Sequence, residues 1–167
     1  SELVAVRVNG KALDISKDIN KKGEFTVTIT EDTTISAEFF GIRSIKVWDA
    51  DKWTQSKNVT IETIGSVDSM TYQTADGKAM PFDKSFEVKD NIGKEPVKYK
   101  ITVNGSGAAE GKTASADVEV KLVDTIAPTV TSSSERVNKK NGGFDHDHWM
   151  VTVQDNGSGL DVDKLKN

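Results

Sequence analysis

The stretch VKYKITVNGSGAAEGKTASADVEVKLV, residues 97–123, decides the predicted fold. Each end alternates apolar and polar residues and is rich in β-branched side chains, which is the pattern of a half-buried β-strand. Between the two ends, Asn104 and Gly105 tolerate the positive φ that a tight turn needs. The stretch therefore predicts two strands, at residues 97–103 and 116–123, separated by a turn.

The same strand pattern recurs along the whole chain. Similar runs predict further strands at residues 4–8, 25–29, 35–39, 42–48, 59–64, 70–74 and 150–153. Turn signals built on Gly separate many of them, at spacings typical of a sandwich or barrel. No stretch has the apolar spacing of a capped helix, and the C-terminal LDVDKLKN, residues 160–167, has room for one or two turns at most. The sequence predicts an all-β protein with very little helix.

Composition excludes several classes of function. The 167 residues carry a net charge of −4 with both signs interspersed, so no basic face is offered to phosphates and nucleic acid is not an expected partner. No apolar run approaches the roughly 18 residues needed to span a bilayer, so we expect no membrane insertion, and the N-terminus lacks the pattern of a signal peptide. Cysteine is absent, which excludes disulfides and thiol chemistry and favours a bacterial over an animal origin.

Two junctions and two internal repeats predict a modular organisation. VDTIAPTV, residues 123–130, ends one apolar run and begins another around a Pro, and a fresh strand is expected directly after Phe40 and Gly41. VRVNGKALDIS (6–16) is similar to TYQTADGKAMPFD (71–83), and WMVTVQDNGSGLD (149–161) to KNVTIETIGSVDS (57–69). These matches predict the second half of a module at 1–41, a complete module at 42–124 and the first half of a module at 125–167. The two halves are complementary, so 125–167 is a candidate to complete 1–41. Chance similarity of short strand motifs is the alternative interpretation.

The motifs at these positions resemble the bacterial Ig-like repeats of Gram-positive cell-surface proteins and large secreted glycosidases. The resemblance rests on DTIAPT (124–129), DNGSGL (155–160) and VRVNGK (6–11), although the hairpin motif comes first here and the opening motif last. It implies tandem immunoglobulin-like β-sandwich modules, an extracellular place on the cell surface or cell wall, and a spacer or sometimes adhesive role. The family has no shared catalytic residues.

Two acidic segments are candidate metal sites. In FDHDHW, residues 144–149, a strand would place Asp145 and Asp147 on one face and His146 and His148 on the other, but no third histidine completes a site. In DNGSGLDVD, the carboxylates of Asp155, Asp161 and Asp163 are weak candidates for calcium, although the spacing is not that of an EF-hand. The preferred interpretation is a polar strand in the first case and an acidic turn in the second, with no cofactor.

Aromatic residues offer the other candidate site. Trp48, Trp53, Trp149, Tyr72 and Tyr99 could form a platform for sugar rings, but burial in a sandwich core is preferred for Trp48. Trp53 lies in a polar segment and is the weak candidate for ligand binding.

No arrangement of residues predicts an enzyme. Ser106 and Ser158 lie in Asn-Gly-Ser-Gly turns rather than in a nucleophile elbow. We therefore expect a non-catalytic structural or spacer module, with a carbohydrate-binding or adhesive module as the alternative. Expected partners are neighbouring modules of the same protein, then a host or cell-wall glycan or protein, and copies of the chain that exchange strands.

Overall fold

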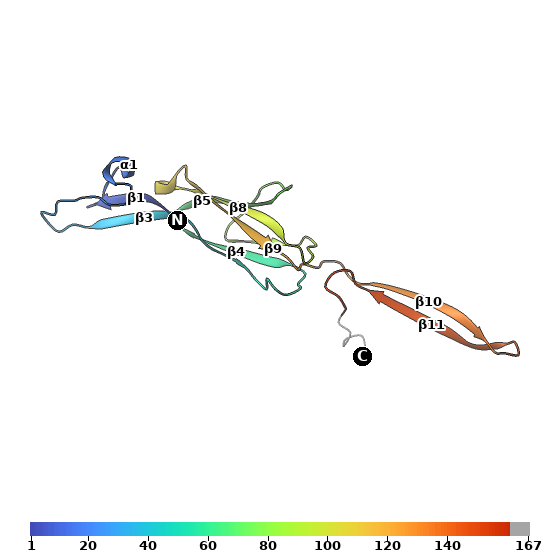
Figure 1. Ribbon diagram of the computed structural model, residues 1–167. Coiled ribbons are helices and arrows are strands. Elements are labelled where there is room, and N and C mark those ends of the chain that lie inside the picture. Colours follow the sequence, from blue (N-terminus) through green and yellow to red (C-terminus); the bar gives the residue numbers. More distant parts are fainter. Residues whose placement is uncertain (161–167) are drawn as a thin grey trace.

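The computed structural model describes residues 1–160, and within them the chain is nearly all β (Figure 1). A body of two antiparallel sheets lies in the middle, with a β-ribbon at one end and a β-hairpin at the other. The regular helices are α1 (Ile15–Asp18) and the 3₁₀ turn η1 (Gly107–Ala109), and neither could cross a membrane. The all-β prediction with very little helix is confirmed for this part of the chain. Most of LDVDKLKN, residues 161–167, lies outside it.

The central body consists of two facing sheets. One contains the second half of β3 (Ile35–Val47), then β4 (Lys57–Ile64) and β7 (Ser85–Val88). The other has the order β6 (Met80–Phe82), β5 (Val67–Thr74), β8 (Val97–Gly105) and β9 (Thr113–Val120). One hydrophobic core joins them, formed by Phe40, Val59, Ile61, Met70, Phe86, Val88, Ile92, Tyr99, Ile101, Val103, Ala109, Val120 and Val123.

The alternation seen in the sequence directs side chains into this core. Along β8, Tyr99, Ile101 and Val103 are buried while Lys98 and Lys100 are exposed, as the period of two requires. Strand β8 pairs with β5 on one side and with β9 on the other, so it is central in its sheet. The strands predicted at 97–103 and 116–123 are therefore confirmed, the second with its ladder ending at Val120.

Aromatic rings fasten the two sheets together. The Tyr72 ring stacks on the Phe86 ring of the facing sheet, with centroids 3.9 Å apart and planes 6° from parallel. The Tyr99 hydroxyl donates a 3.0 Å hydrogen bond to Asp90 Oδ2 in the loop after β7. Burial, with a further contribution from Asp90, raises the pKa of the Tyr99 phenol far above its ordinary value.

The N-terminal ribbon shares a strand with the central body. Its sheet has the order β2 (Lys11–Ala12), β1 (Glu2–Val8) and β3, and β3 changes partner along its length. Residues 35–40 of β3 pair with β1, and residues 41–47 pair with β4. The expectation that one strand ends near Phe40 and a fresh one begins at Ile42 is wrong, because the backbone continues through Gly41. At φ +151° Gly41 lies so close to the N-terminus that an added Cβ would be 3.0 Å from Ser1 Cα.

Residues 25–29 do not form the strand that their alternation predicts. Phe25 and Val27 are half-buried and Ile29 is exposed, but no neighbouring strand pairs with this segment in the described chain. An alternating sequence becomes a strand only where a partner completes its hydrogen-bond ladder.

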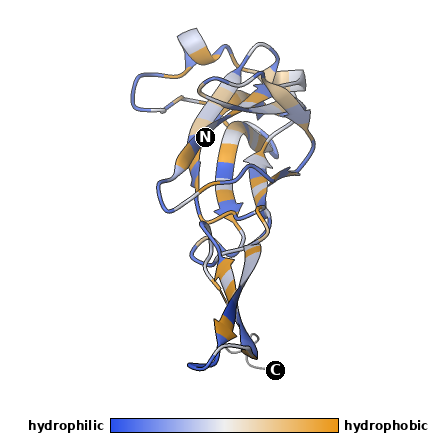
Figure 2. Ribbon diagram, turned by 90° about the vertical axis from the view of Figure 1, so that its right-hand side faces the viewer, coloured by the Kyte–Doolittle hydropathy of each residue, from blue (hydrophilic) through white to orange (hydrophobic). Residues whose placement is uncertain are grey.

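The C-terminal hairpin projects from the other end of the central body. It consists of β10 (Thr129–Asn138) and β11 (Phe144–Gln154), which within residues 1–160 pair only with each other. Figure 2 shows hydrophobic and hydrophilic stretches alternating along it. No strand of residues 1–41 pairs with a strand of residues 125–160, and the two segments lie at opposite ends of the molecule (Figure 1).

Candidate functional site at the Asp124 junction

Three segments that the sequence analysis named meet where the chain leaves the central body and enters the hairpin. A hollow of about 330 Å³ lies here, lined by residues 53–55, residues 124–128 and the turn that contains Asp155 and Ser158. It therefore brings together Trp53, the DTIAPT motif and the DNGSG motif, which are more than 100 residues apart at the extremes. We call this region the Asp124 junction.

Asp124 is the buried charge at the centre of the junction. Its Oδ2 accepts a 2.6 Å hydrogen bond from the Ser158 amide, and its Oδ1 accepts a 3.0 Å bond from the Ile126 amide. The Asp124 amide in turn donates to the Thr54 carbonyl at 2.9 Å. Hydrogen bonds from Ser158, and then from Ile126, hold the pKa of the Asp124 carboxyl below its ordinary value. Asp124 thus links the central body, the segment that leads into β10 and the turn after β11.

The DNGSG turn is shaped to reach Asp124. Asp155 Oδ1 accepts bonds from the amides of Gly157 at 2.7 Å and Gly159 at 3.2 Å, which folds the turn around one carboxylate oxygen. A Cβ on Gly157 would overlap Asp124 Oδ2, so this position requires glycine for close approach. Asp155, Gly157, Ser158 and Gly159 of the motif therefore each have a structural role.

The calcium candidates are only partly placed by the structure. Asp155 uses its carboxylate to fold the turn, while Asp161 and Asp163 lie outside the described residues. Among residues 1–160, no three His, Cys, Asp or Glu side chains are grouped to hold a metal ion.

The FDHDHW segment is the first half of β11. The ladder places Val137 opposite His146 and Glu135 opposite His148, and Asp145 Oδ2 lies 2.9 Å from His146 Nδ1. Because neighbouring residues of a strand point to opposite faces, the two histidines share one face as expected.

The tryptophans occupy three separate places rather than one platform. Trp48, which we expected in the core, is 50% exposed, and its Nε1 donates to Thr60 Oγ1 at 3.0 Å. That expectation is wrong because Val47 takes the inward position, which leaves the next residue facing solvent beneath the Lys46 ammonium, 3.4 Å from its ring centroid. Trp53 is half-buried at the Asp124 junction, and Trp149 is exposed on β11.

The two tyrosines belong to the central core. Tyr99 is buried and Tyr72 packs against the core cluster, which leaves neither ring free for a ligand.

Lys57 is a buried charge that sequence reasoning missed. It is 1% exposed, and its Nζ donates to the backbone carbonyls of Asp49 and Lys52 in the loop between β3 and β4. Burial lowers the pKa of this ammonium, and the nearby Asp49 and Asp51 oppose that shift. The sequence did contain a signal for this burial, because Lys57 is two residues before Val59 and four before Ile61 and so shares their inward face of the strand.

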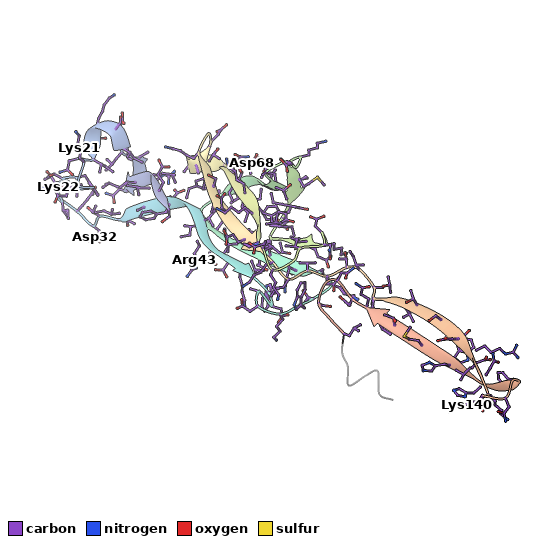
Figure 3. All side chains as sticks on the ribbon, turned by 45° about the vertical axis from the view of Figure 1, so that its right-hand side comes forward. Lys21, Lys22, Asp32, Arg43, Asp68 and Lys140 are labelled. Atoms are coloured by element: carbon purple, nitrogen blue, oxygen red, sulfur yellow. The ribbon has the colours of Figure 1, made fainter. Side chains whose placement is uncertain are left out.

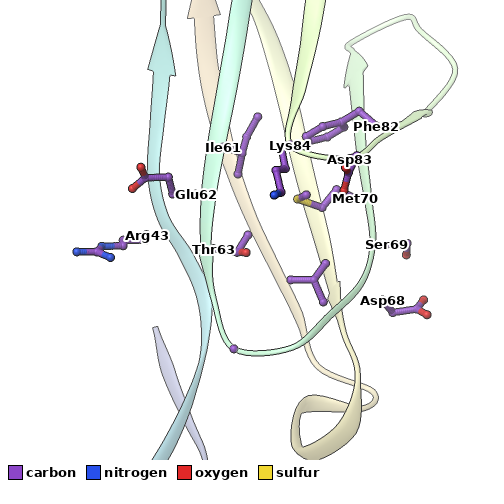
Figure 4. A pocket seen from close by; sticks show the side chains of 12 residues that line it. Arg43, Ile61, Glu62, Thr63, Asp68, Ser69, Met70, Phe82, Asp83 and Lys84 are labelled. Atoms are coloured by element: carbon purple, nitrogen blue, oxygen red, sulfur yellow. The ribbon is translucent and has the colours of Figure 1, made fainter.

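A larger hollow of about 520 Å³ opens beside β4 and β5 (Figure 4). Its apolar floor consists of Ile61, Met70 and Phe82, which belong to the core or pack against it. Arg43 and Glu62 point away from the hollow in Figure 4. It is therefore the open edge between the two sheets.

Comparison with protein-family models, curated proteins and solved structures gives no match to this chain.

Proposed function

We propose that the chain is a non-catalytic structural spacer, built from immunoglobulin-like modules, in a secreted or surface-anchored bacterial protein. The observation that carries this proposal is that neither boundary between units is a loose linker. At one boundary a single strand, β3, serves both units. At the other, Asp124 binds the amide of Ser158 across the junction. A spacer must resist bending, and a shared strand and a hydrogen-bonded junction are connections that favour such resistance.

The topology of the central body supports immunoglobulin-like modules. Its β3-β4-β7 sheet faces its β6-β5-β8-β9 sheet, which corresponds to the two antiparallel sheets of that sandwich. Tyr99, near the start of β8, hydrogen-bonds back to Asp90, in a place similar to the tyrosine corner, although the acceptor is a side chain. On this basis, residues 42–124 are a complete module, and residues 1–41 and 125–167 are the second and first halves of others.

The distribution of charge also suits a spacer. Figure 3 places Lys21, Lys22 and Asp32 at one end of the molecule and Lys140 at the hairpin tip at the other. Charges of both signs are spread along the length, which favours solubility over attraction to one charged partner.

Small-angle X-ray scattering at low protein concentration tests the proposal. We expect the wild-type profile to fit one extended shape, whereas Asp124→Ala should need a range of angles between the central body and the hairpin. Asp117→Ala, an exposed aspartate on β9, is the matched control and should scatter like wild type. A wild-type profile that already needs a broad range of angles would contradict a spacer role.

Carbohydrate binding is the second candidate function, and the position of Trp53 favours it. Its half-buried indole lines the hollow at the Asp124 junction, next to carboxylates that can accept hydrogen bonds from sugar hydroxyls. A glycan array with wild type, Trp53→Ala and the control Trp48→Ala tests this function. Glycan binding that is lost in Trp53→Ala but kept in Trp48→Ala would support carbohydrate binding. An array without any bound glycan would contradict it and favour the spacer function.

A further inference from the structure

The N-terminal ribbon is one sheet of a sandwich without its facing sheet. Its order β2-β1-β3 repeats the order β6-β5-β8 of the central body. In the central body, β3, β4 and β7 cover that sheet and close the core. In the described chain no sheet covers β2-β1-β3 in the same way.

The C-terminal hairpin repeats the strands that are missing there. In the central body, Ile45 lies opposite Ile61 and Val47 opposite Val59. In the hairpin, Val130 lies opposite Val153 and Ser132 opposite Val151, in the same direction and with the same spacing. The repeat of 57–69 at 149–161 thus extends to the strand register, and β10–β11 is a second copy of the β3–β4 pair.

The inward positions of the β3–β4 pair are exposed in the hairpin. Val59 is 0% exposed, whereas its equivalent Val151 is 61% exposed. Val151 shares one face with Val130, Val153 and Trp149, because opposite residues and alternate residues of paired strands point to the same side. His146, His148, Met150 and Thr152 lie on the other face, where Met150 is an exposed apolar residue of β11. The hairpin therefore has a predominantly apolar face, defined by Val130, Trp149, Val151 and Val153, and no sheet within residues 1–160 packs on it.

The N-terminal ribbon has a matching apolar face. Val6, Val8, Ile35, Ala37 and Phe39 all point to one side, as the pairs Val6–Ala37 and Val8–Ile35 show. Val6 is already covered, but Ile35 remains 49% exposed and Phe39 45% exposed. The opposite face contains Ser36 and the Arg7–Glu38 ion pair, and its apolar residues Ala5 and Phe40 are already buried. An amphipathic sheet of this kind needs an apolar partner on one side only.

We propose that the apolar face of the β10–β11 hairpin of one copy packs on the apolar face of the β1–β3 ribbon of a second copy and completes a sandwich there. The two faces lie at opposite ends of the described chain (Figure 1), so they do not pack on each other within one molecule. The chain carries its own template for the packing, since β3–β4 covers β5–β8 in this way in the central body. The inference rests on the modular organisation proposed above.

This contact joins different surfaces of the two copies, so it is heterologous and leaves a free end on each side. Association should continue head to tail, and the average mass should rise with concentration. Residues 25–29 lie between α1 and β3 and have the alternation of a strand but no strand partner in the described chain. The incoming copy can therefore also give them an ordered surface to pack against.

Blocking one end at a time tests the proposal. Ile35→Asp places a charge on the ribbon face, and Val151→Asp places one on the hairpin face; both positions are exposed, so each variant should keep the circular dichroism spectrum of the wild type. By light scattering after gel filtration, each variant alone should be monomeric at concentrations where the wild type oligomerises. Mixed in equal amounts, they should form a dimer that grows no further, because each supplies the end that the other lacks.

The matched controls carry the same charge on the opposite faces. Ser36→Asp and Thr152→Asp are neighbours of the tested positions in the two strands and should oligomerise like wild type. A wild type that stays monomeric at every concentration, a mixture that forms no dimer, or controls that also become monomeric would each overturn the inference. None of these results bears on the stiffness of the single molecule. The spacer proposal is tested independently, by the small-angle X-ray scattering experiment described above.

Discussion

Two charged side chains, Lys57 and Asp124, are buried in the described chain, and backbone groups solvate both of them. Carbonyl oxygens of one loop surround the Lys57 ammonium, and amides of two segments surround the Asp124 carboxylate. A buried charge is tolerated only when polar groups replace the lost water. Each of these residues therefore fastens a loop that has little apolar packing of its own.

Replacing Lys57 by Met should destabilise the protein. The substitution keeps the length of the side chain but leaves the carbonyls of Asp49 and Lys52 without their donor, which costs about 1–3 kcal/mol. Urea denaturation followed by tryptophan fluorescence measures the change. Lys52→Met is the control, because that ammonium is exposed and its ion pair with Asp49 contributes little. An unchanged free energy of unfolding for Lys57→Met would contradict the role of the buried ammonium.

The Asp124 junction should loosen in acid. Because the folded-state pKa of Asp124 is below the ordinary value of 3.8, its ionised form stabilises the fold above that value, and this contribution is lost as the pH falls through the folded pKa. The NMR shift of the Ser158 amide, followed from about pH 6 to about pH 2, reports the protonation directly. We expect the Ser158 amide shift of the wild type to change as Asp124 is protonated. This change should be absent in Asp124→Asn, whose side chain does not titrate. A flat wild-type profile would argue against the hydrogen bond.

At the scale of the elements, glycines allow close approach at the two places where units of the molecule are connected. Strand β3 passes from one sheet to another at Gly41, and the DNGSG turn meets Asp124 at Gly157. At Gly41 a Cβ would crowd the backbone of Ser1, and at Gly157 it would overlap the carboxylate of Asp124.

Gly157→Ala should open the Asp124 junction. The new methyl group would overlap the Asp124 carboxylate, and such overpacking typically costs about 1–3 kcal/mol. Amide hydrogen exchange at Ser158 should become faster than in wild type. Gly93→Ala is the control, since no atom lies within 4 Å of a Cβ at that position and its φ is not in the left-handed region. Equal exchange at Ser158 in both variants would show that the turn does not depend on this contact.

At the scale of the whole molecule, stability should fall from the middle toward both ends. The central body has a closed core, whereas the hairpin is a two-stranded ribbon with both faces exposed. Isolated two-stranded ribbons are only marginally stable in water.

Hydrogen-exchange mass spectrometry should resolve this gradient. At low protein concentration, peptides from β10 and β11 should exchange much faster than peptides from β8, because local opening of the hairpin disrupts no core. Peptides from β9, in the same sheet as β8, provide the internal control and should be protected. Strong protection of the hairpin in the monomer would contradict the expected fall in stability from the central body to the hairpin.

Much of the fold could be predicted, since strands with strict alternation, such as β8 and the inward set of β4, were found from their sequence. Strand β10 escaped because Ser132, Ser133 and Ser134 interrupt its apolar pattern, and β7 because it is only four residues long. The candidate site was predicted less well. Trp53 and Asp155 were named separately, and nothing local indicates that they meet at Asp124.

The sequence by itself determined the all-β character and the positions of most turns, because alternation with a period of two and the φ preferences of Gly and Asn act over a few neighbouring residues. Only the tertiary structure decided that β3 pairs with both β1 and β4, that residues 25–29 form no strand, that Lys57 is buried and that Asp124 binds Ser158. These features depend on partners distant in the chain. A strand is stable only where a neighbouring strand completes its hydrogen bonds, and a buried charge only where polar groups surround it.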